Sequence, residues 1–71
     1  MKGIDMRNDI KALRTDRRWS QAELGTALGV SRQTVIALEN GKYDPSLPLA
    51  FKIAATFEKK IEEIFHPEPG E

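Results

Sequence analysis

The strongest constraint on the fold of this 71-residue chain is a pair of helix-start signals with a glycine between them. Ser20, followed three residues later by Glu23, is typical of a capping box, in which each side chain satisfies a free amide of the first helical turn. Gly29 is expected to end that helix, because glycine adopts a positive φ at little cost. Ser31 then starts another helix, so two short helices must meet across a tight turn.

Helical spacing predicts three further helices around this pair. The first covers about residues 6–17 and has an apolar stripe of Met6, Ile10 and Leu13. The fourth follows a Ser46 cap, and its expected buried stripe consists of Leu47, Ala50, Ile53, Ala54 and Phe57. A last short helix carries Ile61, Ile64 and Phe65. The sequence therefore predicts an all-α, compact five-helix bundle without a strand.

Length and composition limit the domain organisation. We expect one small domain over residues 6–66, preceded by a flexible arm (1–5) and followed by a flexible acidic tail (67–71). The absence of cysteine excludes a disulfide framework and a thiolate metal site. No apolar run is long enough to span a membrane or to form a signal peptide, so the expected location is the cytoplasm.

The formal net charge is zero, from 11 basic and 11 acidic side chains, which at first argues against a nucleic-acid partner. The two signs are distributed unevenly, however. Residues 1–57 carry nine basic and six acidic side chains, whereas residues 58–71 carry two and five, so the net charges are +3 and −3. Such asymmetry within a chain is typical of contact with nucleic acid or a membrane.

The predicted helix after Ser31 has two different faces. Thr34, Val35 and Leu38 share one side and are expected to face the core. The other side carries Arg32, Gln33, Ile36, Ala37 and Asn40. Arginine can bond guanine and glutamine can bond adenine, each through two hydrogen bonds, while an aliphatic side chain can touch a thymine methyl group. Exposed arginine and glutamine are more often merely solvated, but the capped helix and tight turn present this face as a DNA-reading helix is presented.

Four sequence runs carry a family resemblance that covers about residues 10–65. They are Gln21-Ala22-Glu23-Leu24, Gly29-Val30-Ser31-Arg32-Gln33-Thr34-Val35, Leu38-Glu39-Asn40-Gly41-Lys42 and Asp44-Pro45-Ser46-Leu47. The chain resembles the Cro/CI-type helix-turn-helix (XRE) family in its minimal single-domain form. The resemblance implies a lambda repressor-like five-helix domain, a homodimer and binding to operator DNA to control transcription.

The resemblance also implies roles for individual residues. The base-reading positions are Arg32, Gln33 and Ala37, with Ile36 beside them. The DNA-backbone positions are Gln21, Asn40 and Lys42. Ser31 and Tyr43 are further candidates for the backbone, and Tyr43 would contribute its hydroxyl group. Tyr43 has an equally good alternative, which is to pack its ring over the fourth helix. Arg14 and Glu39 match an ion pair between the first and third helices, whose role would be to fix the reading helix.

Several positions depart from the family pattern or have two interpretations. Gly25 stands where alanine is usual; both residues are expected to fit, although glycine costs up to about 1 kcal/mol of helix propensity. Ala37 replaces a longer polar residue, which predicts slack base discrimination there. Trp19 is expected to pack in the core as a hydrophobic staple. Arg17 and Arg18 are expected to be solvated, with phosphate contact as the alternative.

The candidate dimer contact consists of Ile61, Ile64 and Phe65, with Leu49 or Phe51 from the fourth helix. Alternatively, Ile61 and Ile64 close the core of the single chain. A two-fold dimer would place its reading helices about 34 Å apart in successive major grooves, which predicts an operator with an inverted repeat.

Other function classes fit less well. An enzyme is not expected, because the chain has no cysteine, one histidine near its end and little room for a pocket. No cofactor is expected, and His66 with Glu68 and Glu71 makes a poor metal site. The alternative is an antitoxin or coactivator-like module that uses the same helices for a protein partner such as a toxin. The polar, positive face at Arg32 and Gln33 favours DNA, although an antitoxin that represses its own operon would satisfy both interpretations.

Overall fold

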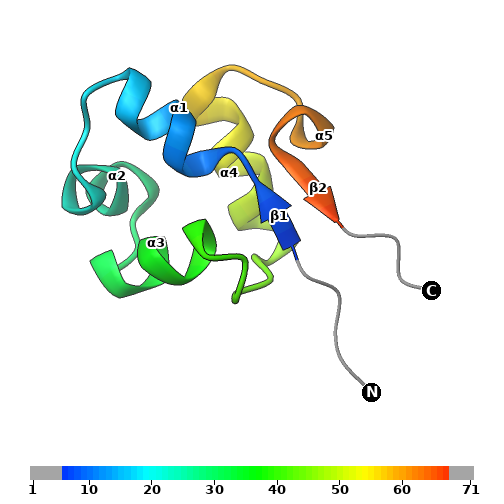
Figure 1. The fold of residues 1–71 in the computed structure, drawn as a ribbon, viewed down its shortest axis with the longest axis horizontal. Helices are drawn as coiled ribbons and strands as arrows, with labels where there is room; N and C mark the ends of the chain where they lie inside the picture. Colours follow the sequence, from blue (N-terminus) through cyan, green and yellow to red (C-terminus); the bar gives the residue numbers. More distant parts are fainter. Residues whose placement is uncertain (1–5, 68–71) are drawn as a thin grey trace.

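The structure, a computed structural model, describes residues 6–67, so the expected arm (1–5) and most of the expected tail (68–71) lie outside it. Within these described residues, five helices and two short strands follow one another (Figure 1). They are β1 (Met6–Asn8), α1 (Ile10–Asp16), α2 (Gln21–Leu28), α3 (Arg32–Glu39), α4 (Leu47–Phe57), α5 (Ile61–Ile64) and β2 (Phe65–Pro67). The prediction of five helices is confirmed, and the fold is nearly all-α with one small sheet.

The two-stranded sheet corrects the predicted ends of the domain. β1 pairs antiparallel with β2, with Met6 opposite Pro67 and Asn8 opposite Phe65. The prediction of a helix from residue 6 is therefore wrong at its start, as is the inclusion of Phe65 in the last helix and of Pro67 in the tail. The physical reason is that strand pairing satisfies backbone groups at both ends of the chain, and a pairing this distant in sequence leaves no local periodicity.

Apolar side chains from all five helices and β2 form the core. The buried members are Ile10, Leu24, Leu28, Val35, Leu38, Ala50, Ile53, Ala54, Phe57, Ile64 and Phe65. The sequence predicts Leu47 in this set, but its side chain is 65% exposed. It is the first residue of α4, and helical side chains tilt toward the N-terminus, so its side chain projects past the end of the core.

The predicted caps around the tight turn are confirmed. The Ser20 hydroxyl accepts a hydrogen bond from the Glu23 amide at 3.0 Å, and the Glu23 carboxylate accepts one from the Ser20 amide at 2.7 Å. Gly29 ends α2 with a φ of 74°, and the Ser31 hydroxyl accepts from the Thr34 amide at 3.1 Å. The capping box fixes where α2 begins, while Gly29 and the Ser31 cap fix where α2 ends and α3 begins.

Gly25 lies where α2 approaches the start of α3 most closely. A Cβ atom at this position would lie 2.8 Å from the carbonyl oxygen of Val30. The expectation that alanine is also small enough for this packing is therefore wrong, because the neighbouring atom belongs to the backbone and cannot rotate away. The amide of Val30 also donates to the carbonyl of Gly25 at 2.9 Å, which holds the two segments at this distance.

Candidate nucleic-acid interface

α3 has the buried and exposed faces that its sequence predicts. Val35 and Leu38 are buried, with exposed fractions of 0% and 1%. On the opposite side the exposed residues are Arg32, Gln33 and, at the C-cap, Asn40, and the half-buried ones are Ile36 and Ala37. α3 lies along the lower edge of the molecule in Figure 1, so its first turn presents a cation and an amide at the surface.

The residues predicted to contact the DNA backbone lie around the two ends of α3. Ser31 is exposed at the N-cap, and Lys42 is exposed in the turn that follows the helix. Gly41, between Asn40 and Lys42, has a φ of 72°, which glycine adopts without strain. Tyr43 is 42% exposed, so part of its surface is open to solvent and part is covered by the protein.

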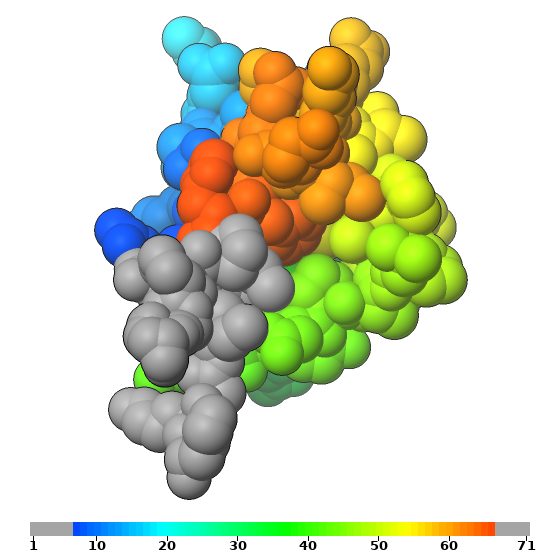
Figure 2. Space-filling model, turned by 90° about the vertical axis from the view of Figure 1, so that its right-hand side faces the viewer, coloured from blue at the N-terminus to red at the C-terminus, as the bar shows by residue number. Residues whose placement is uncertain are grey.

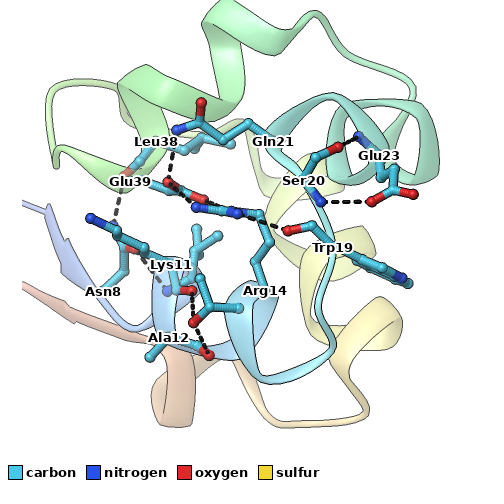
Figure 3. A network of polar contacts seen from close by, with 12 residues as sticks. Asn8, Lys11, Ala12, Arg14, Trp19, Ser20, Gln21, Glu23, Leu38 and Glu39 are labelled. Atoms are coloured by element: carbon cyan, nitrogen blue, oxygen red, sulfur yellow. Dashed lines mark hydrogen bonds and ion pairs between the residues drawn. The ribbon is translucent and has the colours of Figure 1, made fainter.

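A polar network joins the last turn of α3 to α1, α2 and β1 (Figure 3). The Nε of Arg14, from α1, donates to Glu39 Oε2 at 2.6 Å, and its Nη1 donates to the carbonyl of Trp19 at 2.8 Å. Both partners of the ion pair are largely buried, with side-chain exposures of 10% and 3%. A pair with this little solvent costs much to break, because removal of one partner leaves an uncompensated buried charge.

Gln21 joins this network from the start of α2. Its Nε2 donates to Glu39 Oε1 at 3.2 Å, and its side chain is half-buried. A glutamine amide has two N–H donors, so this contact uses one of them. The contact aligns the first turn of α2 with the last turn of α3.

Asn8 is a member of the network that the sequence analysis missed. Its Nδ2 donates to the carbonyl oxygen of Leu38 at 2.8 Å, and its Oδ1 accepts from the amide of Ile10 at 3.0 Å. The second bond is an Asx turn, which an asparagine just before a helix can indicate from sequence. The first bond joins β1 to the end of α3 and has no local sequence signal.

Arg17 is exposed, as expected, but its side chain also makes defined contacts. Its guanidinium lies 5.2 Å from the ring centroid of Trp19 and 5.1 Å from that of Phe57, and its Nη1 donates to the carbonyl of Thr56 at 2.8 Å. Trp19 packs against the core as predicted, with its ring centroid 6.0 Å from that of Phe57. Arg17 thus connects the α1–α2 loop to the end of α4. Arg18 is exposed as well.

The candidate dimer residues divide into enclosed and exposed ones. Ile64 and Phe65 have exposed fractions of 0% and 7%, and Ile61 is half-buried. Ile64 and Phe65 are therefore poor candidates for a dimer contact, because side chains buried within their own chain have almost no exposed area for a partner. Phe51, by contrast, is 58% exposed on α4. Figure 2 shows α4 (yellow) and the loop that precedes it (green) on the surface of the molecule.

Two further kinds of feature are absent from residues 6–67. No helix there is long and apolar enough to cross a membrane. No group of three or more potential metal-ligating side chains occurs in the same range. His66 Nε2 instead lies 3.0 Å from Asp9 Oδ2, beside the sheet.

Comparison with known sequences agrees with this geometry. Residues 10–64 match the helix-turn-helix family HTH_3. An uncharacterized HTH-type transcriptional regulator of Methanocaldococcus jannaschii is 56% identical over 66 residues, which cover 93% of this chain and 100% of the relative. Another, from Bacillus subtilis, is 50% identical over 60 residues, which cover 84% and 91%.

Solved structures show the same fold. The restriction-modification controller protein C.AhdI from Aeromonas hydrophila aligns with a TM-score of 0.67 and 30% identity, over 76% of this chain and 78% of that one. A hypothetical transcription factor from Neisseria aligns with a TM-score of 0.71 and 27% identity, over 83% and 68%. The similarity thus covers most of the chain rather than the two central helices alone.

Proposed function

Because the chain belongs to the helix-turn-helix family of DNA-binding transcriptional regulators, we propose that it is a sequence-specific repressor whose α3 enters the major groove of an operator. The exposed first turn of α3, with Arg32 and Gln33, carries this proposal. Repression needs only that the bound domain exclude other proteins from the site. The proposed activity places the protein in the cytoplasm, with the DNA.

Each exposed group around α3 has a proposed partner on DNA. Arg32 bonds guanine and Gln33 bonds adenine, with Ile36 and Ala37 against thymine methyl groups. The groups proposed to contact phosphates are Gln21, Ser31, Asn40, Lys42 and Tyr43. The second amide donor of Gln21, beside the free N–H groups at the start of α2, is suited to a phosphate.

We further propose that two copies associate through α4. Only Lys52 is charged among its 11 residues. One apolar stripe of α4 faces the core, and a second stripe, at every fourth position on the exposed side, consists of Leu47, Phe51 and Ala55. A helix that is apolar on both sides favours cover on both sides. In a two-fold arrangement, Phe51 of one chain meets Leu47 of the other.

The proposed dimer is weak in solution. Stable interfaces bury roughly 800 Å² on each partner. The Leu47, Phe51 and Ala55 stripe offers only two large side chains, with exposed fractions of 65% and 58% for Leu47 and Phe51. We therefore expect the two copies to associate mainly on the operator. There the two half-sites place the α3 helices of the copies about 34 Å apart.

Selection of bound sequences from random DNA tests the proposed function. We expect enrichment of an inverted repeat, because a two-fold dimer reads the same half-site twice. A single unrepeated motif would contradict the proposed dimer but would still support sequence-specific DNA binding. No enrichment at all would contradict the proposal and favour the alternative of a module that binds a protein partner.

A further inference from the structure

We propose that Asn8 is a positioning residue that holds the turn after α3, residues 40–42, in the conformation that contacts the DNA backbone. This inference rests on the proposed function, because Asn40 and Lys42 in that turn are proposed phosphate contacts. Asn8 itself is not part of the turn but the last residue of β1.

A single side-chain amide joins three elements at this point (Figure 3). Asn8 Nδ2 donates to the carbonyl of Leu38 in α3 at 2.8 Å. Asn8 Oδ1 accepts from the amide of Ile10, the first residue of α1, at 3.0 Å. Because the amide group is planar, the bond to Ile10 sets the direction in which Nδ2 points toward Leu38.

The carbonyl that Asn8 reaches also supports the turn. Leu38 is in the last turn of α3, where carbonyl groups have no partner within the helix. Its oxygen accepts from the amide of Gly41 at 3.1 Å, and the preceding carbonyl, of Ala37, accepts from the amide of Lys42 at 3.0 Å. The carbonyl oxygen of Leu38 therefore has two donors, the amide of Gly41 in the turn and the side chain of Asn8.

β1 provides a firm support for this contact. Asn8 is opposite Phe65 in the sheet, and the next amide, of Asp9, donates to the carbonyl of Ile64 at 2.9 Å. Glu39, the residue after Leu38, is held separately by Arg14. The end of α3 is therefore fixed at two successive residues, once by the ion pair and once by Asn8.

The test compares Asn8→Ala with the wild-type chain in operator binding at several salt concentrations. Loss of the hydrogen bond should weaken binding about 2- to 10-fold. A phosphate contact that is no longer held in place should also lower the slope of log K against log salt concentration by about one. Measurements are made where circular dichroism shows both proteins fully folded, so that a loss of stability does not change the slope.

Ile10→Val is the matched control. Ile10 is fully buried and adjacent to Asn8 in space, and this change lowers stability without altering charge or the bond to Leu38. Its salt slope should equal that of the wild type. An equal loss of slope in both variants, or an unchanged slope and affinity in Asn8→Ala, would overturn the positioning role.

A second measurement needs no DNA. Hydrogen exchange of the Gly41 and Lys42 amides should be faster in Asn8→Ala than in either the wild type or Ile10→Val. If Asn8→Ala does not fold, Asn8→Asp serves instead, because it keeps an acceptor for Ile10 and loses the donor to Leu38. Unchanged exchange would overturn the support of the turn by Asn8. Failure of the wild type to bind any DNA would instead overturn the proposed function and, with it, the phosphate contacts of the turn.

Discussion

At the scale of single residues, Arg32 is expected to decide sequence preference. Its side chain is exposed at the start of α3, where it can form two bonds to guanine. We predict that Arg32→Ala loses about 1–3 kcal/mol of specific binding and relaxes one base position, as measured by repeating the selection from random DNA. Arg18→Ala is the control, since it removes an equal charge from the α1–α2 loop. Unchanged selectivity in Arg32→Ala would remove Arg32 from the base-reading set.

Lys42 is expected to act differently, because a phosphate carries no sequence information. Lys42→Ala should weaken binding to all sequences alike and lower the salt slope by about one. Titrations of operator and random DNA at several salt concentrations measure both effects. A loss confined to the operator would show that Lys42 reads bases instead.

At the scale of elements, the packing of α2 against α3 depends on Gly25. Alanine would gain up to about 1 kcal/mol of helix propensity. Its Cβ, however, would lie 2.8 Å from the backbone oxygen of Val30, and such overpacking costs typically about 1–3 kcal/mol. We therefore predict that Gly25→Ala lowers the free energy of unfolding, measured by urea denaturation.

Ala27→Gly serves as the reference for helix propensity, because Ala27 is exposed in the same helix. It should cost up to about 1 kcal/mol with no packing term. If Gly25→Ala instead stabilises the chain, the turn between α2 and α3 can move by the few tenths of an ångström that the methyl group requires.

The elements also show how far the sequence predicts the structure. The capping box at Ser20, the C-cap at Gly29 and the buried face of α3 follow from short-range patterns, and the structure has all of them. The β1–β2 pairing and the bond from Asn8 to Leu38 join residues distant along the chain, so no local pattern indicates them. The roles of Ile64 and Leu47 depend on where the core ends, which apolar spacing alone does not determine.

At the scale of the whole molecule, the zero net charge combines a body of +3 with an end of −3. Non-specific affinity for DNA depends on the number of phosphates neutralised, so a body charge this small predicts weak, salt-sensitive binding by one chain. Joining two chains on one site makes the second binding event intramolecular and raises the overall affinity without any new base contact. Occupancy of the operator should therefore depend on association through the Leu47, Phe51 and Ala55 stripe.

Phe51→Glu tests this dependence, because Phe51 is 58% exposed and its replacement should leave the fold intact. We predict that this variant keeps the wild-type unfolding midpoint and binds an isolated half-site as the wild type does. In sedimentation it should stay monomeric at protein concentrations at which the wild type begins to associate. Its advantage on the full inverted repeat over the half-site should disappear.

Phe65→Asp is the contrasting variant. Because Phe65 is 7% exposed in the core of the single chain, a carboxylate there should unfold the protein rather than merely separate a dimer. The two variants thus separate association from folding. If Phe51→Glu retains the wild-type preference for the full repeat, the two copies meet through a surface other than α4.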